Sequence, residues 1–150
     1  MPTNHVAASA TLDAPPQAVY AVLADYRGAH ADILPDPWFL GRLEVEEGGT
    51  GAGTVIRFRT RILGATRTIR AKVSEPEPGR VLAETDFETG AVTSFTVDPA
   101  EGGRSRVTIA MEWTRPGLQG WIERWLAPPV LRRIYVAEMI NLERVAAARA

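Results

Sequence analysis

Hydrophobic positions near the N-terminus change from a period of two to a helical spacing. Apolar residues alternate with polar or small ones over residues 6–12, which predicts a strand. The segment LDAPPQAVYAVLADY then carries apolar residues at helical spacing, behind two prolines of the kind that a first helical turn tolerates. Prolines interrupt the next segment, RGAHADILPDPWF, so we expect a second short helix there, followed by a loop.

From Leu43 onward the period is two again. Apolar residues alternate with charged ones over residues 43–46, 56–62 and 69–73, with turns at GGTGAG and LGAT. Further strands are expected near RVLAETD, AVTSFTVD and RSRVTIAMEW, and PAEGG between the last two is typical of a hairpin. The pattern therefore predicts an antiparallel sheet of about six or seven strands.

The C-terminal part of the chain returns to helical spacing. GLQGWIERWL is expected to form a short helix, and PPVLRRIYVAEMINLERVAAARA a long one. At about 100° per residue, one face of the long helix carries Leu131, Ile134, Tyr135, Leu142 and Val145. Helices that are segregated from an antiparallel sheet are typical of an α+β fold. We expect the sheet to curve around this helix.

The composition is that of an ordinary globular protein, and we expect one domain over residues 1–150. Apolar residues make up 45% of the chain and charged residues 23%, and the net charge of −1 favours neither nucleic acid nor an anionic membrane as a partner. The chain has no cysteine, which excludes disulfides and thiolate chemistry. The sequence shows neither a signal peptide nor a membrane span, so we expect a cytoplasmic protein.

A long helix held against one strongly twisted sheet leaves space between the two layers. Small residues such as Ala71 and Ala83 do not fill it, so we expect a residual cavity. At roughly 24 cal/mol per Å³, a dry pocket of about 300 Å³ would cost several kcal/mol. That cost rivals the net stability of a domain, about 5–15 kcal/mol. Water or a ligand should therefore occupy the cavity.

Several segments, in this order and spacing, carry a resemblance to a known family: ATLDAPPQAVYAVLADY, ILPDPWF, GTGAGTVIRF, KVSEPEPGRVL, GGRSRVTIAMEW and the last helix. Together they resemble the START-like or SRPBCC superfamily, which includes polyketide cyclase/dehydrase-type proteins, and the resemblance covers essentially the full length. It implies the helix-grip fold of the birch-pollen allergen, with a cavity for a hydrophobic or amphipathic small molecule between the sheet and the C-terminal helix. It implies no single activity, because such domains serve as carriers, receptors and enzymes.

The iron site of the ring-hydroxylase branch of this superfamily is not expected here. That site needs a cluster of ligands, and His5 and His30 are the only histidines of the chain. Neither histidine has an evident partner for a catalytic relay, so we interpret both as unproductive. We expect no metal and no other cofactor.

Glu138 lies in the middle of the apolar face of the long helix, where a charged side chain is rarely buried without a partner. We favour either a helix that is rotated by a few tens of degrees from this estimate, or a position of Glu138 near the cavity mouth, where water reaches the carboxylate. One alternative is a buried ion pair. The other is a position inside the cavity beside Tyr135, where Glu138 binds the polar end of a ligand or transfers a proton. Burial there would raise the pKa of Glu138, as suits a general acid near neutral pH.

The segment VLAETDFETG leaves two strand registers open. If Leu82 points inward, Glu84 and Asp86 point inward too and make the cavity wall acidic. If Ala83 points inward instead, both acids are solvated, and we favour this register. Arg67 has inward parity on its own strand, so it either meets Glu138 or Glu84, or, as we favour, reaches solvent near a hairpin end.

Inward parity and helical spacing give the side chains that we expect around a ligand. The expected wall consists of Phe58, Thr60, Ile69, Phe95, Val97, Ile109, Met111, Trp113, Tyr135 and Leu142. Glu138 is the candidate polar anchor, and Trp38 with Phe39 the candidate gate. The leading hypothesis is a carrier or binding protein for a lipid-like or aromatic molecule. One alternative is a polyketide cyclase/dehydratase-like enzyme in which Glu138 and Tyr135 transfer protons, and another is a receptor-like module whose gate reports occupancy to a protein partner.

Two patterns on the outer surface are interpreted as structural. A basic outer face consists of Arg57, Arg59, Arg61, Arg70 and Lys72. It lacks aromatic residues for base stacking, and Glu44 and Glu46 can pair across it, so we expect a solvated face and no nucleic-acid partner. GGTGAG is followed by a strand, so it is interpreted as a turn and not as a phosphate-binding loop, which needs a helix in that place.

The tryptophans near the C-terminal helix allow three interpretations. Trp121 and Trp125 are four residues apart and give the short helix one aromatic face. We favour a face that caps the core. The alternatives are a lid over the cavity mouth and a shallow contact with a membrane, without stable insertion. Val136 and Ile140 point away from the inner face of the long helix, so the protein is expected to be a monomer or a weak homodimer.

Overall fold

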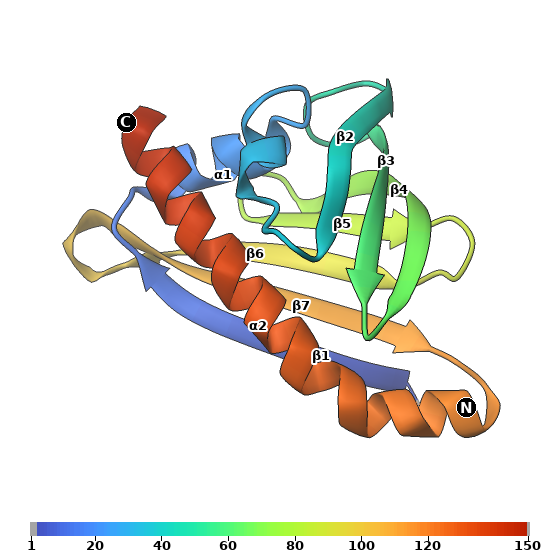
Figure 1. Cartoon of the computed structure of the whole chain (residues 1–150). Coiled ribbons are helices and arrows are strands. Elements are labelled where there is room, and N and C mark those ends of the chain that lie inside the picture. Colours follow the sequence, from blue (N-terminus) through green and yellow to red (C-terminus); the bar gives the residue numbers. More distant parts are fainter. Residues whose placement is uncertain (1–2, 150) are drawn as a thin grey trace.

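The computed structural model describes residues 3–149 and consists of one curved sheet and a long helix that packs against it (Figure 1). The elements are β1 (Thr3–Leu12), α1 (Pro16–Ala24), the 3-10 helix η1 (Ala29–Ile33), β2 (Phe39–Glu47), β3 (Val55–Ile62), β4 (Ala65–Glu77), β5 (Val81–Asp86), β6 (Val92–Ala100), the 3-10 helix η2 (Glu101–Gly103), β7 (Arg104–Thr114) and α2 (Gly117–Arg149). This is the predicted α+β arrangement, with two short helices after the first strand.

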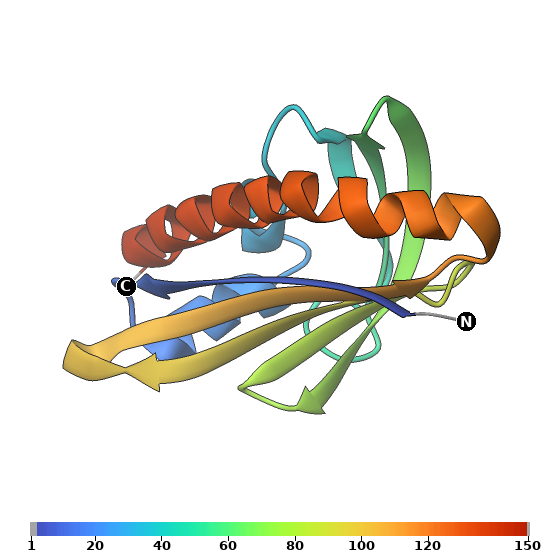
Figure 2. The ribbon, with the colours of Figure 1, turned by 90° about the horizontal axis from the view of Figure 1, so that it is seen from below.

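The sheet has seven strands in the order β1-β7-β6-β5-β4-β3-β2, and every neighbouring pair is antiparallel. The first strand of the chain therefore pairs with the last, along residues 3–12 and 105–114. Figure 2 shows β1, β6 and β7 beneath α2, while β3 and β4 rise beside it. The sheet thus wraps partly around the helix, as the helix-grip prediction requires.

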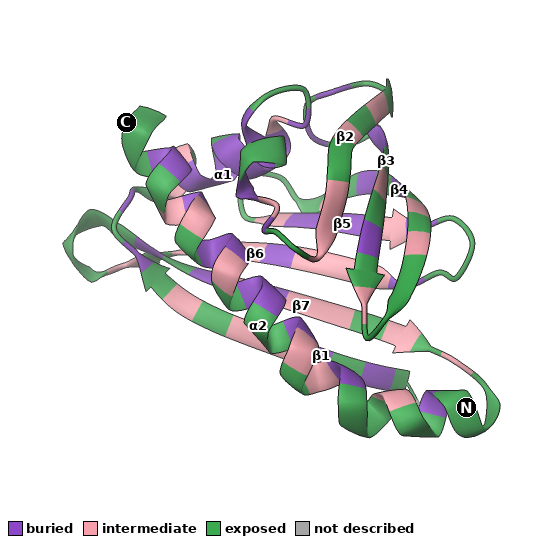
Figure 3. Cartoon of the chain, viewed as in Figure 1, coloured by how far each residue is buried: buried purple, intermediate pink, exposed green. Residues whose placement is uncertain are grey.

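The inner face of α2 is the predicted one. Its predicted apolar stripe is buried throughout, at Leu131, Ile134, Tyr135, Leu142 and Val145. In Figure 3 buried positions recur along α2 between exposed ones. The core between the two layers is completed by α1, whose buried residues include Val19, Val22 and Leu23.

The prediction of two separate C-terminal helices is wrong. One helix runs from Gly117 to Arg149 with Pro128 and Pro129 inside it; Ala150, the predicted last residue, lies outside the described residues. Each proline removes one backbone hydrogen bond to the carbonyl four residues earlier. Those carbonyls belong to Arg124 and Trp125, whose residues are exposed, so water can replace the missing donors. The helix therefore continues where proline alone predicts a break.

The interpretation of the tryptophan pair as a cap on the core is also wrong. Trp121 is 62% exposed and Trp125 is 67% exposed. The first turns of α2 run out toward the ends of the strands (Figure 1), and they meet the sheet with their opposite side, where Asn4 Nδ2 donates to the backbone oxygen of Gly120. Val136 and Ile140 are exposed, as their position on the helix predicts.

The outer surface follows the structural interpretations. GGTGAG lies between β2 and β3, and a Cβ atom at Gly51 would collide with Oε1 of Glu75, which accepts the Ala52 N–H at 2.7 Å. On the basic outer face, Arg70 Nε donates to Glu46 Oε1 at 2.6 Å. None of the helices in residues 3–149 is long and apolar enough to cross a membrane.

Candidate functional site

Glu138 is buried on the inner face of α2, with 4% of its surface exposed. The favoured position at a wet cavity mouth is therefore wrong. The ion-pair alternative is not supported either, because none of the salt bridges within residues 3–149 includes Glu138. Tyr135, one turn earlier on the same face, is equally buried at 4%. The two side chains thus lie in the same buried environment between the helix and the sheet.

The oxygen atoms of Glu138 and Tyr135 are not fully enclosed, although both residues are buried. Within residues 3–149, every side-chain nitrogen or oxygen that is fully enclosed has a hydrogen-bond partner. Neither the Glu138 carboxyl nor the Tyr135 hydroxyl takes part in a side-chain hydrogen bond of this part of the chain, so their oxygens must keep some accessible surface. The hydroxyl of Thr60 on β3, a residue that is 5% exposed, is in the same situation. Three buried polar groups on the inner face, those of Thr60, Tyr135 and Glu138, thus have hydrogen-bonding capacity that no side chain of the described residues uses.

The register of β5 brings two more carboxylates inside, against the register that we favoured. Leu82 is completely buried, and the period of two then places Glu84 and Asp86 on the same inner face, where they are 9% and 8% exposed. The burial of Leu82 decides the register because a shift by one residue would move this side chain into solvent. The inner face of the sheet is therefore acidic at β5.

Asp86 has structural partners. Its Oδ2 lies 3.5 Å from Nη2 of Arg67, and its Oδ1 accepts the N–H of Glu88 at 2.8 Å in the turn after β5. The favoured interpretation of Arg67 as a residue that only reaches solvent is wrong, although its side chain remains 38% exposed. Arg67 thus meets an inward acid, which is Asp86 rather than Glu84 or Glu138.

Glu84 is held by two aromatic side chains, Tyr26 from the segment after α1 and His30 from η1. The Tyr26 hydroxyl donates to Oε2 of Glu84 at 2.7 Å, and Nε2 of His30 lies 3.6 Å from the same oxygen. The rings of Tyr26 and His30 stack with centroids 4.3 Å apart, and Phe95 meets His30 edge-on at 5.9 Å. His30 is 2% exposed. His30 is therefore part of the packed interior, where it contacts Glu84.

The tautomer of His30 follows from its second hydrogen bond. Nδ1 lies 2.7 Å from the backbone oxygen of Leu23, which can only accept, so Nδ1 carries the hydrogen. In the neutral ring Nε2 then faces Glu84 with its lone pair. Burial lowers the pKa of His30, and the negative charge of Glu84, which acts to raise this pKa, offsets only part of the effect. The neutral ring is therefore favoured.

Burial changes the acid–base chemistry of the whole interior. Burial first, and then the charge of Glu84, raise the pKa of Glu138 well above the usual range of a glutamate. The pKa of Tyr135 is raised by burial and then by the charges of Glu138 and Glu84. The pKa of Tyr26 rises for the same reasons, burial first and Glu84 second. Glu138 and Tyr135 are therefore both favoured in their uncharged forms, which can donate a hydrogen bond.

The predicted wall residues lie on the inner face at two depths. Thr60, Phe95, Val97, Ile109, Tyr135 and Leu142 are buried, and Phe58, Ile69, Met111 and Trp113 are half-buried. The gate residues Trp38 and Phe39 are half-buried too, and the Phe39 and Phe58 rings lie 5.8 Å apart. Solvent therefore reaches the inner face on the side of β2, β3 and β4.

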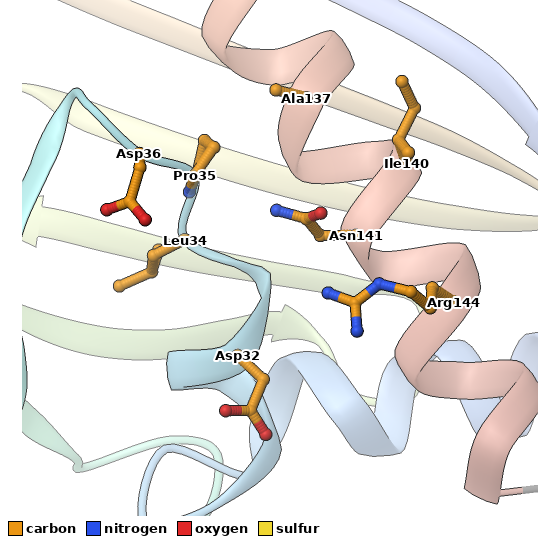
Figure 4. A pocket seen from close by; sticks show the side chains of 8 residues that line it. All are labelled: Asp32, Leu34, Pro35, Asp36, Ala137, Ile140, Asn141 and Arg144. Atoms are coloured by element: carbon orange, nitrogen blue, oxygen red, sulfur yellow. The ribbon is translucent and has the colours of Figure 1, made fainter.

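Two surface hollows flank α2 in the described part of the chain, and neither is lined by the predicted wall. The first, of about 450 Å³, is lined by Asp32, Leu34, Pro35, Asp36, Ala137, Ile140, Asn141 and Arg144 (Figure 4). In Figure 4 the side chains of Asn141 and Arg144 extend from α2 toward the loop that leads to the gate residues. The second, of about 420 Å³, lies between the start of β1 and α2 and includes Arg124, Trp125 and Arg132.

A protein-family model described as "Polyketide cyclase / dehydrase and lipid transport" matches residues 3–147. The chain belongs to this family. The suspected SRPBCC relationship is thereby confirmed. No curated protein matches the chain.

Solved structures agree with the family and its fold. The KanY protein is 31% identical with a TM-score of 0.83, over 98% of this chain and 99% of that one. The Zhui aromatase/cyclase from Streptomyces sp. R1128 is 23% identical with a TM-score of 0.79, over 99% and 96% of the two chains. Major latex-like protein 151 from Panax ginseng is 14% identical with a TM-score of 0.71, over 95% and 96%. The last two likenesses show the SRPBCC fold alone.

Within this SRPBCC interior, sequence reasoning missed the group formed by Tyr26, His30 and Glu84. Tyr26 ends the helical spacing of the segment LDAPPQAVYAVLADY, and His30 lies in the short helix expected after it. One signal was present, because the two rings are four residues apart in the sequence. What was missing was the register of β5, which alone puts Glu84 opposite them.

Proposed function

We propose that the protein binds an apolar or amphipathic small molecule between the inner face of the sheet and α2, as a carrier or binding protein. The observation that carries this proposal is the pair of buried oxygen-bearing groups, Glu138 and Tyr135, that have accessible surface and no hydrogen-bond partner within residues 3–149. An unpaired polar group in apolar surroundings costs about 1–3 kcal/mol. A ligand or water that bonds to it recovers that cost.

The surroundings set the chemistry of the ligand. The inner face of the sheet is apolar at Phe58, Phe95 and Ile109, which suits a hydrocarbon or aromatic body. Uncharged Glu138 and Tyr135 both donate hydrogen bonds, so they suit an acceptor such as a ketone, ester or carboxylic acid oxygen. The acidic inner face at Glu84 disfavours an anionic end. We therefore expect a neutral, oxygen-bearing ligand.

The family supports this proposal without naming a ligand. Its description joins chemistry on polyketides with transport of lipids, and both classes of molecule combine an apolar body with oxygen atoms. KanY supports the family relationship, and the aromatase/cyclase supports the fold.

The proposal is tested with Glu138→Gln, which keeps the size of the side chain and removes the acidic proton. Gently purified wild-type protein is denatured, and the released small molecules are identified by mass spectrometry. We expect a stoichiometric apolar compound in the wild type and a loss of occupancy in the variant. Glu112→Gln is the matched control, because Glu112 is exposed on β7 and should leave occupancy unchanged. Equal occupancy in the wild type and in Glu138→Gln would show that Glu138 does not contribute to ligand binding.

A second candidate function is a polyketide cyclase/dehydratase-like activity, and the raised pKa of Glu138 is the observation that favours it. A carboxyl that keeps its proton near neutral pH can protonate a ketone or a leaving hydroxyl, while Tyr135 donates a hydrogen bond to the same ligand. Offered a poly-β-ketone thioester mimic, an enzyme should lose turnover by roughly 10²–10⁴-fold in Glu138→Gln and keep its affinity. A carrier should show no turnover in either protein.

A further inference from the structure

The first turns of α2 carry an exposed apolar stripe. It consists of Leu118, Trp121, Ile122, Trp125 and Leu126, which follow one another at helical spacing on one side of the helix. Their exposed fractions range from 41% to 72%. Figure 3 shows this end of α2 as largely exposed. Contiguous apolar groups of this kind mark interaction sites on proteins.

The opposite side of these turns is fixed to the sheet. Asn4 Nδ2 donates to the backbone oxygen of Gly120 at 3.2 Å. Trp113 Nε1 donates to Oε1 of Glu123 at 3.0 Å, and Arg115 Nε lies 3.0 Å from the other oxygen of that carboxylate. The stripe is therefore held outward on an anchored helix, and it does not act as a lid over the inner face.

The charge of this end differs from that of the whole chain. Residues 115–133 hold four arginines and one glutamate, a local net charge of +3 in a chain of net charge −1. The one glutamate, Glu123, is already engaged on the anchored side. Arg124, Arg132 and Arg133 are exposed beside the stripe and form no salt bridge within residues 3–149. Two of them line the 420 Å³ hollow together with Trp125.

We propose that this Trp121–Trp125 surface, meaning the apolar stripe with Arg124, Arg132 and Arg133, docks on the surface of an anionic phospholipid bilayer. Tryptophan rings prefer the boundary between headgroups and acyl chains, and arginines beside them attract lipid phosphates. Shallow contact is the expected mode, because the helix is too polar to span. A second copy of the chain fits less well, because a symmetric contact brings both sets of arginines together without a free acid.

The test is sedimentation of the full-length protein with vesicles of phosphatidylcholine, alone or mixed with phosphatidylglycerol, at low and high salt. We expect binding to the phosphatidylglycerol vesicles only, with a decrease at high salt. The double variant Trp121→Ser/Trp125→Ser should bind at least about tenfold more weakly. Arg132→Gln/Arg133→Gln should weaken binding several-fold and reduce its salt dependence. All four positions are exposed, so folding should be retained, and circular dichroism checks it.

Phe87→Ser is the matched control, because Phe87 is a 52% exposed aromatic residue after β5, away from this surface. It should bind like the wild type. Two results would overturn the proposal. One is wild-type protein that stays in the supernatant with anionic vesicles; the other is tryptophan variants that sediment as the wild type does. A third result would also contradict it: the wild type does not bind vesicles and is a dimer, and the tryptophan variant is a monomer. The surface would then join two copies of the chain, and the bilayer assignment would be wrong.

Discussion

Tyr26 and Tyr20 make the same hydrogen bond in different surroundings. Each hydroxyl donates to a glutamate oxygen at 2.7 Å, Tyr26 to Glu84 and Tyr20 to Glu75. Glu84 is buried, whereas Glu75 is half-buried and also accepts the Ala52 N–H. A carboxylate that loses a donor in the interior has no water to replace it. The two tyrosines therefore separate the effect of burial from the effect of the bond itself.

We predict that Tyr26→Phe lowers the free energy of unfolding by about 1–3 kcal/mol, because Glu84 keeps only the more distant His30 beside it. Tyr20→Phe should cost no more than about 1 kcal/mol, since solvent reaches Glu75. Urea denaturation of both variants and the wild type measures the difference. Equal losses in the two variants would show that Glu84 does not depend on Tyr26.

At the residue scale, the sequence predicted the candidate anchor but not its surroundings. Helical spacing was sufficient to place Glu138 and Tyr135 on the inner face of α2. Glu84 could not be placed, because in VLAETD it shares its parity with Leu82 and Asp86, while the other parity holds only apolar or small residues and so favours the wrong register. His30 could not be placed either, because a 3-10 turn has no periodicity from which a buried position follows.

At the scale of elements, a strand or helix was predictable wherever its hydrophobic period extends over several residues. The strands of the sheet and the inner face of α2 are examples. The continuity of α2 through Pro128 and Pro129 was not predictable from local rules, because proline ordinarily ends a helix. Contacts on both sides hold the helix here: Asn4 bonds to Gly120 before the prolines, and Leu131 is buried after them.

Pro129 is the position at which this continuity can be tested. It is exposed, and it leaves the carbonyl of Trp125 without its helical donor. We predict that Pro129→Ala raises the free energy of unfolding by about 1–2 kcal/mol. The variant gains a helical hydrogen bond, and this gain is partly offset because alanine restricts the unfolded chain less than proline does. Pro116→Ala, at an exposed position just before α2, should change it by less than about 0.5 kcal/mol. No gain in thermal or urea unfolding would mean that the helix is interrupted at this point.

At the scale of the whole molecule, the predictable property was the order of the elements, and it was enough to give the fold and the family. Properties that depend on where charges gather were not predictable from totals. The net charge of −1 conceals a basic end of α2 and a set of three buried carboxyl groups, those of Glu84, Asp86 and Glu138. The first of these carries the bilayer proposal, and the second makes stability depend on pH.

The pH dependence follows from the raised pKa of Glu138. The pKa of Glu138 is higher in the folded protein than in the unfolded chain, where a glutamate has a pKa of about 4.3. The stability that comes from this difference is fully present below that pH. Above that pH the unfolded chain releases the proton and the folded one does not, so stability falls by up to about 1.4 kcal/mol per pH unit until the pH passes the folded pKa. The lowered pKa of His30 acts in the opposite direction, because it removes stability as the pH falls below about 6.5.

Glu138→Gln isolates the first effect from the second. The variant keeps an uncharged side chain at every pH and leaves His30 unchanged, so the difference in unfolding free energy between variant and wild type reports Glu138 alone. We predict that the variant gains on the order of 1–3 kcal/mol relative to the wild type between about pH 5 and pH 7. Urea unfolding of ligand-free protein across this range measures the gain, with Glu112→Gln as the exposed control that should show none. A constant difference would mean that Glu138 titrates like an exposed glutamate, and the uncharged donor proposed for the ligand's oxygen would then not exist.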